Sequence, residues 1–313
     1  MKSRKVIVVT GPTASGKSSL GIKLAKEFNG EIISADSRQV YRRMDLGTGK
    51  VKIEKIAKLN SKERRLGKCF SEGVVHYLLD IADPRKEQFN MVKFQRLAQE
   101  AIELIFSQKK TPLIVGGTML YIDALIKGFQ SPGSSDLKLR KQLESKPIKK
   151  LLKVLKELDS ETYNKIDREN RYRIIRAIET KKLTNKSFFS AQKKMKPDFN
   201  SLILVISRPR KELYQSIDQR VGQRIDQGMI REIRELHNWG LGWREMERFG
   251  LEYRFLSRYL RNMLSEEKAI ERLKYQSHRY ARQQLVWWRQ NKRAVWIKSF
   301  SKAKRLGRDF LAD

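Results

Sequence analysis

A glycine-rich loop near the amino end constrains the fold of this chain more than any other feature. Its residues GPTASGKS, from Gly11 to Ser18, match the pattern G-x-x-x-x-G-K-[ST] in full. The β-branched run from Lys5 to Thr10 precedes the loop, and SSLGIKLAKEF, with apolar residues at helical spacing, follows it. A strand, a phosphate-binding loop and a helix in this order form a P-loop unit. The segment therefore predicts an α/β fold that binds a di- or triphosphate.

Each part of this loop contributes to phosphate binding. The glycines allow backbone N–H groups to turn toward phosphate oxygens, and the amino end of the helix adds its positive dipole. Lys17 supplies a positive charge, and Ser18 offers a hydroxyl to a metal ion, for which we expect Mg²⁺. A glycine turn that binds nothing is the alternative. The predicted diphosphate-binding residues are Gly11, Pro12, Thr13, Ala14, Ser15, Gly16, Lys17 and Ser18.

Two further strand patterns extend the predicted sheet. GEIISADS contains a strand from Glu31 to Ser34 that delivers Asp36 and Ser37 to a loop at its carboxyl end, where open α/β sheets bind ligands. A helical pattern around Phe94 to Phe106 is followed by TPLIVGGT, whose continuous apolar run is typical of a strand buried on both faces of a parallel sheet. We therefore expect a P-loop NTPase-like parallel sheet flanked by helices.

The middle of the chain has a different pattern. Residues 120–200 show helical periodicity, dense lysine and arginine and no convincing strand, which predicts a helical, basic insertion domain. Residues 1–119 would form the first part of the α/β core, and residues 201–300 would complete it. Residues 301–313 form a basic tail that we expect to be loosely held.

The completed core is expected to contain two strands and two long helices. The strands are predicted at Ser201–Ser207 and Ala294–Ile297, and the helices at Lys211–Asn238 and Glu266–Arg289. The lysine-rich stretch Lys50–Lys68 carries no firm structural signal.

The charge of the chain indicates a polyanionic partner. The sequence has 68 Lys and Arg against 35 Asp and Glu, a formal net charge of +33. Nucleic acid is favoured over membrane, although a merely solvated basic surface is the alternative. No stretch approaches the roughly 18 apolar residues of a membrane span, and Cys69, the single cysteine, excludes a disulfide within the chain. We expect a cytoplasmic monomer without membrane contact.

The machinery of a nucleotide hydrolase or kinase is not obvious in this sequence. Such an enzyme needs an acidic metal ligand at the end of a second strand, whereas PLIVGGT ends in Gly116, Gly117 and Thr118, and Asp80 after YLL is a weak candidate. Asp36 is expected close to the P-loop, where a carboxylate could accept a proton from a nucleophile. A helix cap or a metal ligand is an equally open interpretation of Asp36 taken alone.

Six segments in one order resemble the bacterial tRNA dimethylallyltransferases of the IPP transferase family. They are GPTASGKS, SADSRQVYRRMDLGTGK, HYLLDIADP, LIVGGTMLY, NRYRIIRAIE and ARQQLVWWR. The resemblance covers the chain from about Lys5 to Ile297. It implies transfer of a dimethylallyl group from dimethylallyl diphosphate to N6 of the adenosine on the 3′ side of the anticodon in tRNA, with Mg²⁺ and release of diphosphate.

The resemblance also implies roles for single residues. The P-loop would hold the diphosphate of the donor, Asp36 would be the general base at N6, and Thr118 would lie near the reacting centre. Arg220 would reach the diphosphate, although it could also be a surface arginine beside the apolar stripe of its helix. Thr118 could instead be a hydroxyl that satisfies a backbone group at a strand end.

A wider set of residues would contact tRNA. These residues are Asp36, Ser37, Arg38, Gln39, Thr118, Arg140, Arg171, Arg173, Arg176, Arg282, Gln283 and Arg289. Each arginine alone could be solvated charge. The segment FGLEYRF, from Phe249, differs from the shorter glycine–tyrosine motif of many bacterial members, so contacts of Gly250 to Tyr253 do not carry over.

Three other functions fit part of the pattern. A related enzyme could prenylate free adenine nucleotide, although it would have little use for the basic helical region. The P-loop and the charge alone would permit a nucleic-acid-stimulated ATPase or a small-molecule kinase. An RNA-binding protein with a relic P-loop is the third possibility.

Overall fold

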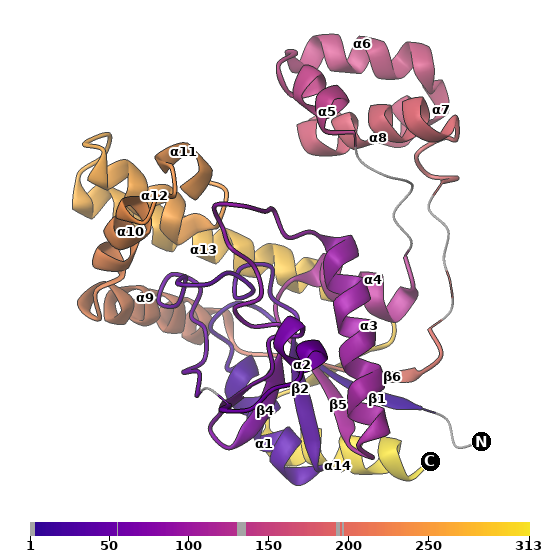
Figure 1. Cartoon of the computed structure of the whole chain (residues 1–313), viewed down its shortest axis with the longest axis vertical. Coiled ribbons are helices and arrows are strands. Elements are labelled where there is room, and N and C mark those ends of the chain that lie inside the picture. Colours follow the sequence, from indigo (N-terminus) through magenta and orange to yellow (C-terminus); the bar gives the residue numbers. More distant parts are fainter. Residues whose placement is uncertain (1–3, 55, 130–135, 192–194, 196) are drawn as a thin grey trace. The chain divides into compact units, whose positions relative to one another are not determined.

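A computed structural model shows that the chain forms two compact units (Figure 1). The structure describes residues 4–54, 56–129, 136–191, 195 and 197–313. The core unit consists of Met1–Ile126 and Asp198–Asp313, and the helical unit is Lys127–Pro197.

A seven-stranded sheet in the order β3-β4-β2-β5-β1-β6-β7 organises the core unit. The strands are β1 (Lys5–Thr10), β2 (Gly30–Ser34), β3 (Cys69–Ser71), β4 (Val74–Tyr77), β5 (Thr111–Val115), β6 (Asn200–Ile206) and β7 (Ala294–Ile297). All neighbouring strands are parallel except β3 and β4, which pair antiparallel. The expected P-loop type of parallel sheet is confirmed, with β1 between β5 and β6.

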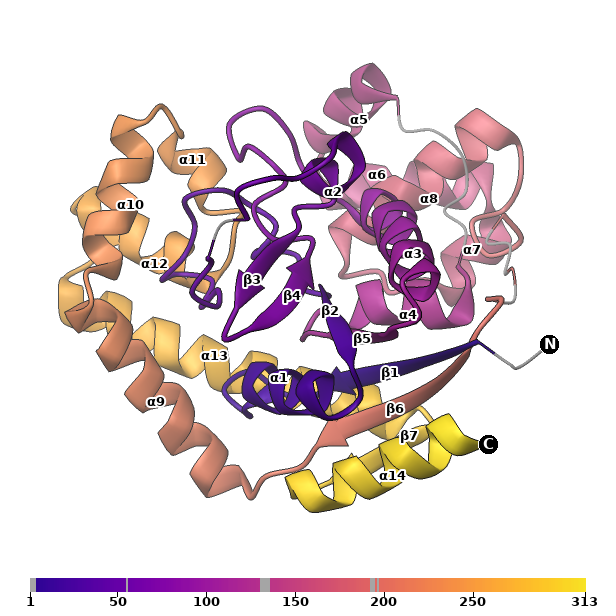
Figure 2. The same cartoon turned by 60° about the horizontal axis from the view of Figure 1, so that its bottom comes forward.

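Alternation along β1 shows how both faces of the sheet are covered. Val6 and Val8 lie in a buried cluster with α3 (Met91–Ser107) and α4 (Met119–Lys127). Ile7 and Val9 lie in a separate cluster with α1 (Lys17–Glu27) and α14 (Phe300–Ala312). Figure 2 shows these two helical layers on opposite sides of the strands. Because successive side chains of a strand point to opposite faces, an uninterrupted apolar run is what a doubly covered sheet requires.

A second group of helices stands beside the sheet in the core unit. It comprises α9 (Arg210–Asp226), α10 (Met229–Asn238), α11 (Trp243–Met246), α12 (Leu251–Leu260) and α13 (Glu266–Arg289). Apolar residues of these helices form one cluster with Val40, Tyr41 and Met44, which follow β2 in the chain. The segment after β2 is therefore packed against helices far later in the chain, whose buried residues in this cluster run from Val221 to Leu273, and this contact shapes the site.

The helical unit has its own small core. Helices α5 (Leu137–Glu144), α6 (Ile148–Leu158), α7 (Ser160–Lys165) and α8 (Arg171–Thr184) surround buried apolar side chains, among them Leu151, Leu155, Ile174 and Ile178. The unit begins at Lys127 rather than at residue 120. The reason is that α4 buries Tyr121, Ile122 and Leu125 in the core of the sheet.

Two expectations about the later chain were wrong. The tail after residue 300 is the helix α14, in which Ala303 is buried and Gly307 leaves room for the ring of Phe28. The single helix expected over Lys211–Asn238 is broken into α9 and α10 at Gly228, whose φ of 101° lies in the left-handed region that glycine accepts. The stretch after Lys50 contains the short helix α2 (Ser61–Arg65), which starts with a capping box at Asn60.

Candidate active site

The P-loop joins β1 to α1 and has the backbone that phosphate binding requires. Gly16 precedes α1 with a φ of 91°, and Ala14 also has a positive φ of 59°. Such a turn in front of a helix directs N–H groups toward one point. The loop lines a cavity of about 710 Å³ through Thr13 to Ser18.

Lys17 is held inside this loop. Its Nζ donates to the carbonyl oxygen of Pro12 at 2.7 Å. The pKa of Lys17 is lowered to about 7, chiefly by burial and in addition by the nearby guanidinium of Arg220. The Asp36 carboxylate acts in the opposite direction and raises this pKa. A cation kept in such an environment is poised to take a negatively charged ligand, because an anion would restore the charged form of the lysine.

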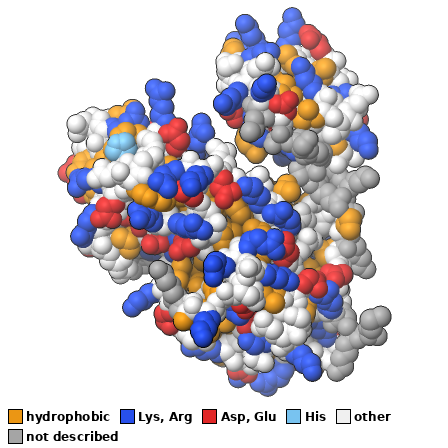
Figure 3. All heavy atoms as spheres, viewed as in Figure 1, with side chains coloured by type: hydrophobic (Ala, Val, Ile, Leu, Met, Phe, Trp, Pro, Cys, Tyr) orange, Lys and Arg blue, Asp and Glu red, His pale blue; other side chains and the backbone are white. Residues whose placement is uncertain are grey.

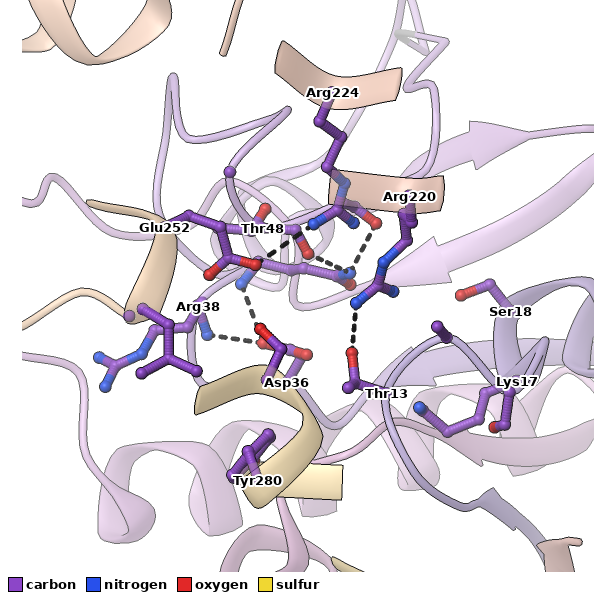
Figure 4. A pocket seen from close by; sticks show the side chains of 18 of the residues that line it. Thr13, Lys17, Ser18, Asp36, Arg38, Thr48, Arg220, Arg224, Glu252 and Tyr280 are labelled. Atoms are coloured by element: carbon purple, nitrogen blue, oxygen red, sulfur yellow. Dashed lines mark hydrogen bonds and ion pairs between the residues drawn. The ribbon is translucent and has the colours of Figure 1, made fainter. Parts of the chain in front are cut away.

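Asp36 lies at the carboxyl end of β2 and points into the same cavity (Figure 4). Its Oδ1 accepts from the backbone N–H of Arg38 at 2.8 Å and from that of Gln39 at 3.4 Å. Among the described residues, no protein group donates to Oδ2. One oxygen therefore fixes the turn after β2, and the other remains available to a ligand.

Thr118 connects the ends of β5 and β2. Its Oγ1 accepts the N–H of Ser37 at 2.9 Å, and its own N–H donates to the carbonyl oxygen of Ala35 at 3.1 Å. A Cβ at Gly116 would lie 2.2 Å from that same Ala35 oxygen, so only glycine allows the two loops to approach. Thr118 therefore satisfies the backbone N–H of the residue next to Asp36, and it also lines the cavity.

Two arginines of α9 line the cavity opposite these loops. Arg220 donates through Nη2 to Thr13 Oγ1 of the P-loop. Burial, and then the neighbouring Arg224, lower the pKa of Arg220 to about 10. Arg224 Nη1 lies 3.4 Å from Glu252 Oε1. The phosphate end of the cavity thus contains two desolvated basic side chains, Lys17 and Arg220, and the guanidinium of Arg220 lowers the pKa of Lys17.

Most of the predicted site residues meet in this cavity. They are Thr13, Ala14, Ser15, Gly16, Lys17, Ser18, Asp36, Ser37, Arg38, Gln39, Thr118, Arg220 and Gln283. Sequence reasoning missed Arg224, Glu252 and Tyr280, which line it as well. Tyr280 lies close to Asp36 in Figure 4, and burial together with the Asp36 charge raises its pKa to about 12, so its hydroxyl stays protonated.

Gln284 is a further residue that sequence reasoning missed. Its Oε1 accepts the N–H of Thr13 at 2.8 Å, and its Nε2 donates to the carbonyl oxygen of Gly117 at 2.8 Å. Gln284 is buried, whereas its neighbour Gln283 is exposed on α13. The helical spacing of Ala281, Gln284 and Trp288, all buried, was the available signal for this difference.

Comparison with known proteins decides the family. A family model described as IPP transferase matches residues 39–291. The chain belongs to the IPP transferase family. It is 39% identical over 290 residues to tRNA dimethylallyltransferase 2 of Shewanella sediminis, covering 92% of this chain and 90% of that protein. It is 38% identical over 300 residues to tRNA dimethylallyltransferase of Thermomicrobium roseum, covering 94% and 86%.

Solved structures of IPP transferases and related enzymes have the same fold. The full-length tRNA isopentenylpyrophosphate transferase of Bacillus halodurans matches with a TM-score of 0.68 and 33% identity, over 99% of this chain and 96% of that one. A eukaryotic dimethylallyltransferase acting on tRNA matches with a TM-score of 0.72 and 28% identity, over 91% of this chain and 70% of that one. The predicted family and fold are therefore confirmed.

The acidic metal ligand of a nucleotide hydrolase is not found at the end of the strand next to β1. β5, the neighbour of β1, ends in glycines, and Asp80 lies beyond β4 with its Oδ1 2.5 Å from Lys50 Nζ. Asp80 is not among the residues that line the cavity. In the part of the chain that the structure describes, no group of three His, Cys, Asp or Glu side chains could hold a metal ion.

The arginines of the helical unit differ in their surroundings. Arg171 donates to the carbonyl oxygens of Glu144 and Lys146, both at 2.6 Å, and so caps α5. Arg140 and Arg176 both face the buried Glu179, at 3.6 and 3.2 Å. Arg173 is exposed, and its side chain has no partner among the described residues. Arg173 is thus the member of this set with a free cationic side chain.

The expected contacts on α13 are also divided. Arg282 Nη1 donates to the hydroxyl of Tyr214 at 3.3 Å, and Arg289 is exposed at the end of the helix. Trp288 is fully buried, while Trp287 is partly exposed and donates to Asp123 Oδ2 at 3.0 Å.

No helix in the described ranges has the length and apolar character to cross a membrane.

Proposed function

We propose that this IPP transferase moves a dimethylallyl group from dimethylallyl diphosphate to N6 of the adenosine on the 3′ side of the anticodon in tRNA. One observation carries the proposal: the P-loop and Asp36 open into one cavity, while the neighbouring strand β5 lacks an acidic end. This arrangement suits a reaction that releases diphosphate and removes one proton. It places no acidic residue at the end of β5, where a phosphoryl-transfer site would hold its metal ion, and Glu252, the other carboxylate of the lining, faces Arg224.

The phosphate end of the cavity would stabilise the leaving group. As the bond between the allylic carbon and the diphosphate oxygen breaks, negative charge grows on the diphosphate. Lys17, Arg220 and the P-loop lie together at this end of the cavity, where their N–H groups would donate to that charge. Preorganised donors of this kind each contribute about 10²- to 10³-fold in rate in comparable sites.

Asp36 would accept the proton that the nucleophile loses. The N6 amino group forms the new bond to carbon and must release one hydrogen, and Asp36 Oδ2 is the oxygen open to the cavity. Oδ1 stays bonded to the turn, which keeps the carboxylate in one orientation. A positioned base contributes typically about 10²- to 10⁴-fold.

The residues present fit a magnesium ion bound chiefly through the substrate. Ser18 lines the cavity directly after Lys17, and its exposed hydroxyl is a hard oxygen ligand. Mg²⁺ commonly takes one or two protein oxygens together with phosphate oxygens and water, so the absence of a carboxylate cluster among the described residues agrees with such a site. When bound, Mg²⁺ would neutralise charge on the departing diphosphate.

The basic surface supports tRNA as the acceptor. Lysine and arginine side chains are spread across the face seen in Figure 3, as a net charge of +33 requires. Phosphate contacts depend chiefly on such charge and provide affinity without sequence information. The target adenosine itself would have to leave its stack to reach the cavity.

The proposal is tested by transfer of radiolabel from dimethylallyl diphosphate to an unmodified anticodon stem-loop, with Mg²⁺ and without ATP. We expect label in the RNA that carries adenosine beside the anticodon and none in a loop with guanosine there. A preference for AMP over the stem-loop would replace this function with prenylation of free nucleotide. Hydrolysis of ATP without any transfer would contradict both.

A further inference from the structure

Glu232 of α10 holds a loop that lies about 185 residues earlier in the chain. Its Oε2 accepts the backbone N–H groups of Asp45 and Leu46, at 2.9 and 2.6 Å. Its Oε1 accepts the N–H of Gly47 at 3.0 Å and the hydroxyl of Tyr253 at 2.8 Å. One carboxylate thus receives four hydrogen bonds, three of them from consecutive backbone amides. We call the segment from Asp45 to Gly49 the 45–49 loop.

Further contacts leave the 45–49 loop little freedom. A Cβ on Gly47 would lie 2.5 Å from the ring of Tyr253, and one on Gly49 would lie 1.6 Å from Arg224 Nη2. The next residue after the loop, Lys50, has an almost fully buried side chain, and its Nζ donates to the carbonyl oxygen of Tyr41 at 2.8 Å. Helices α9, α10 and α12 therefore press on the loop from one side, and Glu232 supplies the directional contact.

The loop in turn orients the side chain of Gln39, which lines the cavity. Gln39 Nε2 donates to the carbonyl oxygens of Thr48 and Gly49, at 3.4 and 3.1 Å. Since both partners are pure acceptors, they determine which end of the amide is nitrogen. Gln39 Oε1 lies at the other end, 3.2 Å from Ser34 Oγ, and retains one lone pair. Gln39 can therefore offer an acceptor to a ligand but no further hydrogen.

We propose that Glu232 is a positioning residue for selection of the acceptor base, acting through the 45–49 loop on Gln39. This inference rests on the proposed function. An acceptor in the cavity matches the exocyclic amino group of adenine and repels the O6 oxygen of guanine. If Glu232 released the loop, Thr48 and Gly49 would no longer orient the amide, and Gln39 could rotate to present its amino group instead.

The test is the affinity of two anticodon stem-loops, with adenosine or guanosine at the target position, for the wild type and for Glu232→Gln. The substitution keeps the size of the side chain but replaces one acceptor oxygen with a donor that faces backbone amides. We expect the preference for adenosine to fall by about tenfold, while the affinity for inorganic diphosphate changes less than twofold. Glu247→Gln is the matched control, because Glu247 is also half-buried and accepts from Arg258 and Arg261 outside the cavity.

A graded variant protects the test against simple unfolding. Tyr253→Phe removes one of the four hydrogen bonds to Glu232 and keeps the ring against Gly47, so the preference should fall by about two- to threefold. An unchanged preference in both variants, with thermal stability lowered as in Glu247→Gln, would overturn the inference and leave the proposed function intact. A wild-type chain that neither transfers the dimethylallyl group nor prefers adenosine would overturn the proposed function and this inference with it.

Discussion

The two ends of the cavity are built in different ways. The phosphate end is made by consecutive residues of the P-loop, Thr13 to Ser18, together with Arg220, which bonds to Thr13 from a distant part of the chain. The acceptor end is assembled from the turn after β2, the 45–49 loop and helices α9, α10 and α12. The first is a local backbone structure that binds charge. The second is a tertiary structure that sets the direction of single hydrogen bonds.

Because the two ends are built differently, substitutions at one end should affect one ligand and leave the binding of the other unchanged. A change at the phosphate end should abolish the use of diphosphate without altering RNA affinity, because Lys17 and the loop amides serve only that ligand. A change at the acceptor end should alter the choice of base and leave diphosphate binding as it was. Asp36 lies where the two ends meet and should affect turnover alone.

Asp36→Asn should give the largest loss. The amide oxygen can still accept from Arg38 and Gln39, so the turn survives, but the side chain can no longer take a proton. We expect single-turnover transfer to slow by about 10²- to 10⁴-fold, with the affinities for tRNA and diphosphate nearly unchanged. Rates within tenfold of the wild type would remove Asp36 from the role of base.

Lys17→Met should come next. Loss of the cation from the phosphate end is expected to lower kcat/KM for dimethylallyl diphosphate by about 10²- to 10³-fold, while the affinity for tRNA is retained. Lys23→Met is the control, because Lys23 is an exposed lysine on the same helix α1. Equal losses in the two variants would show that the effect is one of general charge.

The pH dependence of stability should reveal the unusual state of Lys17. Its pKa is about 7 in the folded chain and about 10.5 in the unfolded chain, so the unfolded state binds more protons between these values. The unfavourable contribution of Lys17 is thus fully present below pH 7 and disappears as the pH rises toward 10.5. Lys17→Met should therefore raise the Tm of the ligand-free protein at pH 6.5 by about 2–4 °C. The difference should shrink toward pH 10, and a constant difference in thermal scans across that range would contradict this account.

Arg173→Gln should have the smallest effect. Arg173 is the exposed arginine of α8, so its loss should weaken tRNA binding a few-fold and reduce the slope of log affinity against log salt by about one unit. Arg171→Gln is the comparison, because Arg171 caps α5 and should lower stability instead. An unaltered salt slope for Arg173→Gln would place that side chain outside the tRNA interface.

The phosphate end could be predicted almost completely from the sequence. A loop between a strand and a helix is specified by residues that are neighbours in the chain, so its glycines and Lys17 reveal it directly. Asp36 and Thr118 were also within reach, because parallel strands bring their carboxyl ends to one edge of a sheet.

The acceptor end could not be predicted in the same way. Glu232 holds a loop that is far away in the sequence, and a glutamate on a polar helix face gives no sign of that contact. Gln284 was obscured by an equally polar neighbour, although its spacing from Trp288 indicated the buried face of α13. The break at Gly228 was missed because the glycine within a long amphipathic pattern was not considered. The helix after residue 300 was missed because the basic residues of that segment obscured its apolar stripe.

The central claim is that the P-loop serves the leaving diphosphate of a prenyl donor and not a nucleotide. The most direct test is calorimetric titration of inorganic diphosphate and, separately, of ATP into the wild type. Mg²⁺ is present throughout, and each titration is repeated with dimethylallyl diphosphate as a competitor. We predict that diphosphate binds, is displaced by dimethylallyl diphosphate and loses its affinity in Lys17→Met. Tight binding and hydrolysis of ATP, with no competition from dimethylallyl diphosphate, would contradict the claim.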